Sequence, residues 1–499
     1  MAVVGTLALY QPWRALPFEI VDFSEFLPFL RLPTFAERWH AFLHYYGALG
    51  RWNILGYLGL IAKWTAFGTH TEWWQTARFI QMWAIVAGVY LLLRRFGADR
   101  SGAAAGAGLF TVAVPAVPAW VRLTMGEPSG FLCLLAALLL ATGYRRSVWW
   151  VGEGLAIALL VALALLTKEM LVAMVPFVVV VGSCVAAPGS LAWPKVDRRT
   201  LWLIALTALS VAAVLIHVAD VARGGGFTSA YTARLIDWRS LITNFGAVAL
   251  PMRGSRPSVI GQLSAPANAL LLALLLIAGV LVAVRGSASG LSRGQAFAWI
   301  ALALSLPCAV VAAYQPWSFF QDFYGLPFLL GTAMLVAAAV TVVDRSAPLV
   351  GVLARAACVM ILLLAGAAAV WPVRQSMARR AVHGALAGYL VTHDIGAPVI
   401  VMSDDIFGIP WQGPGPTLRR YALALYPEAQ LGNFADAHCA VPPHRFAVNG
   451  RQGVVVTYAS NCRSYPGATA TFRETYRYPI LWPPALRRDS VRVDVCGER

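Results

Sequence analysis

Three carboxylates lie close together near the N-terminus of this 499-residue chain: Glu19, Asp22 and Glu25, in the stretch FEIVDFSEFLPF. Only 12% of the residues are charged, so such a cluster is unusual. A spacing of three residues places acids along one side of a helical turn or around the mouth of a cavity. Like charges this close raise one another's pKa and destabilise a fold. The cluster therefore indicates a use, such as accepting a proton from a substrate.

The composition predicts a membrane protein with many spans. Hydrophobic residues make up 59% of the chain and the mean hydropathy is +0.67, which is too apolar for one globule in water. The formal net charge of +16 is scattered through short loops between apolar runs. This pattern suits topology signals and contact with anionic lipid headgroups or phosphates, and it does not indicate nucleic acid as a partner.

Ten apolar stretches have a length close to that of a membrane span. We expect these spans at 77–95, 103–120, 128–143, 150–166, 170–187, 201–219, 266–285, 296–313, 325–343 and 350–372. Before them, AVVGTLALY is too short to cross alone. It is expected to be the outer half of a helix that starts upstream, or a short tilted span.

The loops between these spans alternate in character, which predicts their sidedness. One set carries paired or single basic residues: Arg94, Arg95, Arg100, Arg145, Arg146, Lys195, Arg198, Arg199, Arg285, Arg293 and Arg345. By the positive-inside rule this set is cytoplasmic. The first outer loop, 13–76, and the polar tail then lie outside. The high Ala, Val and Arg usage favours a bacterial inner membrane, with the tail in the periplasm.

The predicted fold class is a polytopic α-helical membrane protein, residues 1–372, with a C-terminal extracytoplasmic α/β domain, residues 373–499. In the first outer loop, PTFAERWHAFLHYYG and GRWNILGYLGLIAKW have the periodicity of helices lying in the membrane interface. In the tail, APVIVMSDD, GVVVTYAS, ATFRETYRYP and SVRVDVCG read as strands, and HGALAGYLVTHD and TLRRYALALY as helices. Whether two of the three tail cysteines form a disulfide stays open.

Further polar residues lie at the expected outer ends of spans. There they raise the free energy of the fold unless they are paired with an opposite charge, hydrated, or part of a functional site. They are Arg51, Arg122, Glu127, Lys168, Glu169, Gln321, Asp322 and Tyr324. Lys168 and Glu169 either mark a turn and reach water, or Lys168 holds an anionic headgroup. Glu127, just before Pro128, is also an ordinary helix-start signal. Clustering on one side favours an enzyme that acts on a lipid-borne substrate, because a transporter more often places such residues near the midplane.

Taken in order, several stretches resemble the GT-C superfamily of polytopic glycosyltransferases. These are the acidic VDFSEF, then GRWNIL, the hairpin ALLTKEMLVAMVP and the aromatic FFQDFYGLPFL. The chain looks most like the branch of protein O-mannosyltransferases and lipid A aminoarabinose transferases, over roughly residues 13–343. The resemblance implies transfer of a sugar from a polyprenyl (undecaprenyl) phosphate donor to an acceptor hydroxyl, by direct inverting displacement.

The resemblance also implies roles for single residues. Members place a catalytic Asp or Glu in the first outer loop, which maps onto Asp22 first, Glu25 second and Glu19 third. Donor phosphate binding is implied for Arg51, Lys168 and Arg122, and a place in the substrate pocket for Glu127, Glu169, Gln321 and Tyr324. The first loop has no DxD pattern, so no metal and no cofactor is expected, with a divalent cation left open.

Other functions remain open from the sequence. The arginines of loop 220–265 fit an O-antigen polymerase or ligase, and a lipid-linked oligosaccharide transporter or an inactive binding protein would share the composition. The expected partners are a polyprenyl-phosphate-linked sugar, membrane lipids, and a glycolipid, glycan or protein acceptor. The identities of sugar and acceptor depend on pocket shape, which residue spacing does not reveal.

Overall fold

The computed structural model describes much of the helical region and parts of the C-terminal region. The described residues are 2–13, 16–18, 26–48, 53–113, 116–187, 190–191, 196–223, 325–346, 348–392, 399–402, 414–426, 428–431, 434–437, 447–448, 451–452, 454–458, 468–476 and 491–498. The expected spans 266–285 and 296–313 and most of loop 220–265 lie outside them.

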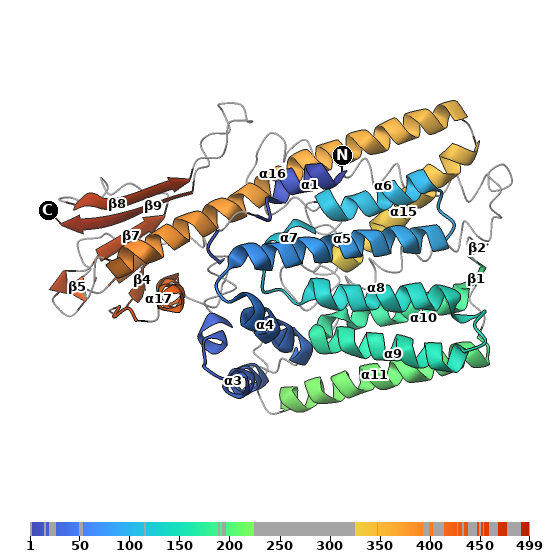
Figure 1. Ribbon diagram of the computed structural model, residues 1–499, viewed down its shortest axis with the longest axis horizontal. Coiled ribbons are helices and arrows are strands. Elements are labelled where there is room, and N and C mark those ends of the chain that lie inside the picture. Colours follow the sequence, from blue (N-terminus) through green and yellow to red (C-terminus); the bar gives the residue numbers. More distant parts are fainter. Residues whose placement is uncertain are drawn as a thin grey trace.

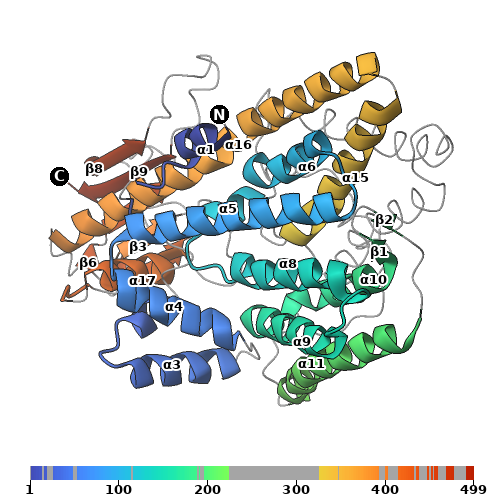
Figure 2. The same ribbon diagram turned by 45° about the vertical axis from the view of Figure 1, so that its right-hand side comes forward.

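A bundle of roughly aligned helices forms the body of the protein (Figures 1 and 2). Its members are α1 (Ala2–Tyr10), α5 (Thr71–Arg95), α6 (Arg100–Val112), α7 (Val117–Val121), α8 (Glu127–Tyr144), α9 (Trp150–Thr167), α10 (Val175–Cys184), α11 (Arg198–Arg223), α15 (Gly325–Ser346) and α16 (Pro348–Thr392). By length and apolar composition, α5, α8 and α9 are each able to cross a bilayer. Shorter apolar helices are Leu171–Cys184, which includes all of α10, Leu329–Thr341 within α15, and Ile54–Phe67. All of these except Ile54–Phe67, which belongs to the predicted first outer loop, lie where spans are predicted.

Small residues allow close helix packing within the bundle. A Cβ at Gly102 would lie 2.6 Å from the carbonyl oxygen of Ala337, and one at Gly106 would lie 2.5 Å from that of Ala333. α6 therefore meets α15 backbone to backbone, as small residues four apart permit in membrane helices. Asp99 caps α6 by accepting a hydrogen bond from the Gly102 amide at 2.6 Å.

Two of the expected spans differ in detail from the structure. The stretch 103–120 is not one helix: α6 ends at Val112, and Ala113 adopts extended backbone (φ −68°, ψ 132°) before α7 begins. Pro115 and Pro118 lack the amide that helix continuation needs, which explains the break. The stretch 170–187 starts as a 3-10 helix, η2 (Glu169–Met174), continues as α10, and ends in β1 (Val185–Ala187), which pairs with β2 (Ser190–Leu191).

The first outer loop contains the two predicted helices, α3 (Phe35–Ala48) and α4 (Ile54–Phe67). A capping box starts α3: the Glu37 amide donates to Thr34 Oγ1 at 3.2 Å, and the Thr34 amide donates to Glu37 Oε2 at 3.0 Å. Both helices pack into a small apolar core that we call the outer-loop cluster. Its buried members are Phe18, Leu27, Leu30, Phe42, Tyr57, Leu60, Ile61, Trp74 and Leu123.

The C-terminal region joins the bundle through α16. This helix runs 45 residues without interruption past position 372, where the domain boundary is predicted, and packs against β8 and β9. The elements that follow it in the chain are α17 (Pro414–Leu425), β3 (Val399–Met402), β4 (Phe434–Ala437), β5 (Ala447–Val448), β6 (Arg451–Gln452), β7 (Val454–Tyr458), β8 (Ala468–Tyr476) and β9 (Val491–Glu498).

Five of these strands form one sheet in the order β4-β3-β7-β9-β8. Within it, β3 pairs in parallel with β4 and β7, while β9 pairs antiparallel with β7 and β8. The stretches predicted as strands in the tail thus contain β3 and β7 and overlap most of β8 and β9, and α17 contains most of the predicted helix TLRRYALALY. The division of the chain at 372, and the placement of the tail outside the cell, stay predictions.

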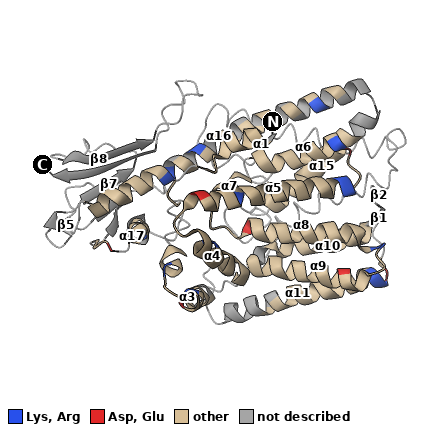
Figure 3. Cartoon of the chain, viewed as in Figure 1, with Lys and Arg blue, Asp and Glu red and all other residues tan. Residues whose placement is uncertain are grey.

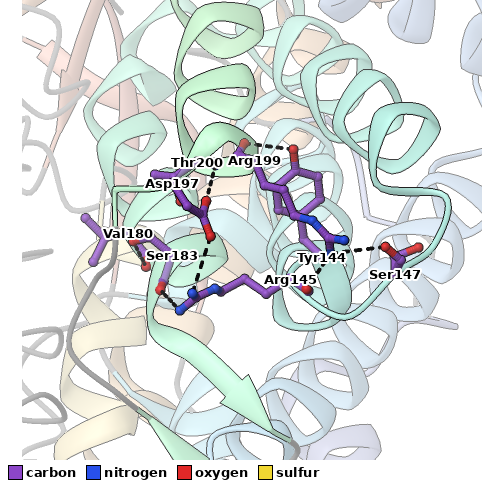
Figure 4. Close-up of polar contacts among 8 residues, drawn as sticks. All are labelled: Tyr144, Arg145, Ser147, Val180, Ser183, Asp197, Arg199 and Thr200. Atoms are coloured by element: carbon purple, nitrogen blue, oxygen red, sulfur yellow. Dashed lines mark hydrogen bonds and ion pairs between the residues drawn. The ribbon is translucent and has the colours of Figure 1, made fainter.

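Arginines gather at the bundle end that lies away from the sheet, where α5 and α8 end and α11 begins (Figure 3). There Arg145 donates to the Ser183 carbonyl at 3.0 Å and contacts Asp197 at 3.4 Å, while the Tyr144 hydroxyl donates to the Arg199 carbonyl at 2.9 Å (Figure 4). The hydrogen bond that the Thr200 amide donates is the main cause that lowers the pKa of the Asp197 carboxyl, and the positive charge of Arg145 lowers it further. These contacts tie three helix ends together at the end predicted to be cytoplasmic.

Candidate active site

The two flanks of the acidic segment enter the outer-loop cluster. Glu19, Asp22 and Glu25 lie outside the described residues, but Phe18 precedes them and residues 26–30 follow as a helical turn. Phe18 is buried against Trp74, with ring centroids 5.6 Å apart in an edge-on arrangement. Leu27 is buried in the same cluster. Both sides of the acidic segment therefore return to one place, at the start of α5.

A buried ion pair lies at the same end of the bundle. Lys168 Nζ is 3.1 Å from Glu127 Oε1, and their side chains are only 13% and 7% exposed. Glu127 is the first residue of α8 and Lys168 follows the last residue of α9. A negative charge at a helix start and a positive charge at a helix end are each favoured by the helix dipole. Lys168 therefore does not extend into water, as one interpretation of the sequence held.

Backbone segments converge beside this pair. The Thr167 carbonyl oxygen would lie 3.1 Å from a Cβ added at Gly56 in α4, and also 3.1 Å from one added at Gly126, just before α8. A Cβ at Gly126 would also lie 3.9 Å from the Cα of Gly56. Glycine at both positions lets α4 lie directly over the ends of α8 and α9.

Arg78 of α5 fixes the loop that leads to Glu127. Its Nη2 donates to the carbonyls of Leu123 and Met125, at 3.0 and 2.7 Å, and its Nη1 donates to Gln81 Oε1 at 2.9 Å. Gln81 in turn donates to Ser129 Oγ at 2.8 Å. Because the guanidinium is almost fully buried, these bonds determine the conformation of the loop.

A second cation, Lys63 of α4, lies near enough to Arg78 for the charge of Arg78 to affect its pKa. Lys63 Nζ lies 5.9 Å from the centroid of the Trp74 ring, a distance suited to a cation–π contact. Burial, and secondly the positive charge of Arg78, lower the pKa of Lys63 to about 7. Two cations in one place repel each other, and an anion bound near them would relieve that repulsion.

Two buried polar atoms beside these groups have no hydrogen-bond partner within the described part of the chain. They are Asn53 Oδ1, at the start of α4, and Thr124 Oγ1, in the loop that Arg78 holds. The two residues are 9% and 5% exposed. Since buried polar atoms are nearly always hydrogen-bonded, these two are candidates to bind hydroxyl groups of a substrate.

The predicted site residues are distributed unevenly in the structure. Glu127 and Lys168 are brought together, and Arg122, which is half-buried, directly precedes the loop held by Arg78. Arg51, Gln321, Tyr324 and the side chain of Glu169 lie outside what the structure describes, so their roles stay predictions. Sequence reasoning missed Arg78, Lys63, Asn53 and Thr124. Two of them lie in stretches that the sequence singles out: Asn53 belongs to GRWNIL, and Lys63 to GRWNILGYLGLIAKW.

A comparison with solved structures finds proteins whose backbone aligns with most of this chain. No family model and no curated protein matches the chain. ArnT from Cupriavidus metallidurans in the apo state matches with 14% identity and a TM-score of 0.48, over 99% of this chain and 96% of that one. The same protein bound to undecaprenyl phosphate gives a TM-score of 0.44, with the same identity and coverage.

The archaeal oligosaccharyltransferase AglB from Archaeoglobus fulgidus, in complex with an inhibitory peptide and a dolichol-phosphate, also matches. Its identity is 14% and its TM-score 0.44, over 84% of this chain and 62% of that one. ArnT and AglB are GT-C glycosyltransferases, the superfamily that the sequence motifs resemble. At this identity and these TM-scores, what the chain does has to be argued from its own residues.

Proposed function

We propose that the protein transfers a sugar from a polyprenyl phosphate donor to an acceptor hydroxyl at the outer face of a bacterial inner membrane. One observation carries the proposal: the flanks of the acidic segment meet, in a single apolar cluster, the bundle end that holds Lys63, Arg78 and Lys168. Phe18 and Leu27, from either side of the segment, share this cluster with Leu123, which leads into the loop before Glu127. A proton acceptor and cations for a phosphate are thus within reach of one substrate.

Chain length supports the placement of the base. Asp22 is four residues from Phe18 and four from Phe26, and four residues span at most about 14 Å. In the proposed reaction the Asp22 carboxylate takes the proton of the acceptor hydroxyl. The hydroxyl oxygen attacks the anomeric carbon from the face opposite the phosphate, so the configuration inverts. The bond between carbon and phosphate oxygen breaks, and polyprenyl phosphate leaves with the electron pair.

The cations of the site suit a phosphate leaving group to different degrees. Lys168 is already neutralised by Glu127, so it adds little net positive charge where it stands. The positive charge of Arg78 helps to lower the pKa of Lys63, so an anion near the two residues would be favoured. Together with Arg51 and Arg122, they would stabilise the charge that develops on the phosphate. Asn53 and Thr124 would then hydrogen-bond hydroxyl groups of the sugar.

Three buried hydroxyls of the bundle fit an enzyme better than a transporter. Thr142, Thr167 and Ser183 each donate to a carbonyl of their own helix, at 2.7, 2.7 and 2.8 Å. In the described helices these groups are satisfied locally and do not line a polar route between the two faces. A transporter is expected to keep its polar binding groups near the midplane.

The test uses purified protein and a panel of radiolabelled undecaprenyl-phosphate sugars, with a membrane extract as acceptor source. We expect the wild type to release undecaprenyl phosphate from at least one donor, and Asp22→Asn to reduce the rate about 10²- to 10⁴-fold. Glu19→Gln and Glu25→Gln test the second choices. Glu37→Gln is the matched control, since this acid of the same loop caps α3. Parallel reactions with EDTA measure any need for a divalent cation.

Each outcome has a distinct meaning. Retained activity in Asp22→Asn, with loss in Glu25→Gln or Glu19→Gln, would move the base to that residue. Binding of a donor by the wild type without turnover of any donor in the panel would contradict the enzyme proposal and favour a transporter.

A further inference from the structure

The C-terminal region contacts both flanks of the acidic segment, and we propose that it positions this segment for the transfer reaction. Arg380 of α16 and Tyr421 of α17 are then positioning residues. The proposal rests on the function proposed above, and it adds a role for a part of the chain that is remote in sequence from the candidate base.

The upstream flank, residues 16–18, is held through its backbone carbonyls. Arg380 donates through Nε to the Pro17 carbonyl at 2.5 Å and through Nη2 to the Leu16 carbonyl at 2.7 Å. The Tyr421 hydroxyl donates to the Phe18 carbonyl at 2.7 Å. Both side chains are almost fully buried, so these bonds do not compete with bulk water. Three successive carbonyls just before Glu19 are therefore fixed.

The downstream flank is held from the same region. Arg31, which follows the helical turn 26–30, donates through Nη2 to the Leu425 carbonyl at the end of α17, at 3.0 Å. The positive charge of Arg31 is also stabilised by Glu428, although burial has the larger effect and lowers the pKa of Arg31. α17 therefore contacts the chain on both sides of the acidic segment.

Close packing adds a steric constraint to the hydrogen bonds. A Cβ at Gly384 in α16 would overlap Cγ of Pro17 and lie 2.9 Å from its Cβ. The proline ring is rigid, so any side chain larger than hydrogen at position 384 must displace the upstream flank. Glycine weakens a helix interior, and here it allows α16 to lie directly against Pro17.

Fixing both flanks has a catalytic consequence. A general base works only within hydrogen-bond reach of the proton it accepts, and a displacement of about 1 Å can cost as much as about 10²-fold in rate. Residues 19–25 are joined directly to these flanks, so a shift of either flank moves an end of the acidic segment. Loosening the flanks should therefore slow the chemical step, while the donor, bound mainly by the bundle, should bind nearly as before.

The experiment compares three variants of the full-length protein in detergent micelles. Tyr421→Phe removes one hydrogen bond without changing shape, Arg380→Lys removes the two-pronged contact, and Gly384→Ala pushes on Pro17. Tyr144→Phe is the control for the first, because the buried Tyr144 hydroxyl also donates to a distant carbonyl, at the opposite bundle end. Gly366→Ala is the control for the third, because a Cβ there meets only an ordinary contact at 3.6 Å in the same helix.

Two readouts are measured on every variant. Hydrogen exchange of peptides covering residues 15–31 reports whether the flanks are held, and does not depend on activity. Steady-state kinetics separate kcat from KM for the donor. We expect all three variants to exchange at least about threefold faster in 15–31 and to lose about 10- to 100-fold in kcat, with KM changed less than about threefold. The two controls should match the wild type in both readouts.

Other results would overturn the proposal. Exchange in 15–31 as slow as in the controls would show that the C-terminal region does not hold the flanks. Faster exchange with unchanged kcat would show that holding them does not matter for the reaction. If the wild type transfers no sugar at all, the proposed function and the positioning role both fail, and the exchange data still decide whether α16 and α17 hold the segment.

Discussion

Glu127 and Lys168 form an ion pair of 3.1 Å that joins the first residue of α8 to the residue that follows α9. Each charge alone lies where a helix dipole favours it. Together they close the open end of a helical hairpin, α8 and α9, whose other end is the turn around Arg145. Because both side chains are nearly buried, neither charge can be lost without leaving the other in an apolar place.

The ion pair predicts strong coupling between substitutions. Glu127→Gln and Lys168→Met should each lower the apparent Tm in micelles, because each leaves one buried charge without its partner. The double variant should lie closer to the wild type than the sum of the two losses, with a coupling energy of about 1–3 kcal/mol. Arg145→Met with Asp197→Asn is the control cycle, since this 3.4 Å pair is more exposed and should couple by less than about 1 kcal/mol. Additive losses at 127 and 168 would contradict the prediction.

Lys63 predicts a pH dependence of stability with a defined sign. Its pKa is about 7 in the folded protein, lowered from 10.5, so between these values the unfolded chain binds more protons. Stability should therefore rise with pH from about 7 to about 10.5, and the contribution of this residue is least favourable below pH 7. Thermal unfolding of the wild type and Lys63→Met across this range measures it. The difference between the two curves should change with pH, and a constant difference would refute the lowered pKa.

Local signals made part of this fold predictable. The helices α3, α4, α8 and α9 follow from apolar periodicity and from start signals such as Thr34 with Glu37, which bond as a capping box. The break after Val112 was equally readable, because Pro115 and Pro118 stand in the sequence. It was missed because mean hydropathy over a window does not register the lost amide groups.

The interior of the site was not predictable in the same way. Arg78 reads as a charged residue at the start of a span, and its partners, the carbonyls of Leu123 and Met125, are 45 and 47 positions away. Glu127 and Lys168 were each singled out, but nothing in either stretch indicates that they pair. Such contacts depend on how helices pack in three dimensions, and a single sequence records no trace of that packing beyond residue type.

Apolar substitutions at Asn53 and Thr124 should weaken binding of the donor without lowering the stability of the fold. Thr124→Val keeps the shape and removes a buried hydroxyl whose oxygen has no partner in the described structure, so the apparent Tm should stay the same or rise. If the hydroxyl binds the sugar, KM for the donor should rise about 2- to 10-fold, the worth of one hydrogen bond. Asn53→Leu should act in the same direction. Thr142→Val is the control, because Thr142 donates within its own helix and should leave KM unchanged.

Substitution of Arg78 should have two effects, one on the mobility of the loop before Glu127 and one on the pKa of Lys63. Arg78→Gln removes the donor that holds the Leu123 and Met125 carbonyls, so the loop before Glu127 should exchange its amide hydrogens faster. It also removes the positive charge that helps to lower the pKa of Lys63, so this pKa should rise and the pH-dependent part of the stability should shift to higher pH. Both effects are measured on one protein, by hydrogen exchange and by thermal unfolding against pH.

Arg94→Gln is the matched control for Arg78→Gln, because Arg94 lies in the same helix and also donates to a turn carbonyl, that of Ala98, at 2.5 Å. It should loosen only the turn after α5 and should not change the pH range over which Lys63 affects the stability. If Arg94→Gln shifts the pH range over which Lys63 changes the stability, or if Arg78→Gln does not shift it, then Arg78 does not help to set the pKa of Lys63. The proposal that Lys63 and Arg78 help to hold the donor phosphate would then lose its electrostatic basis, and the phosphate would have to be held by Arg51 and Arg122.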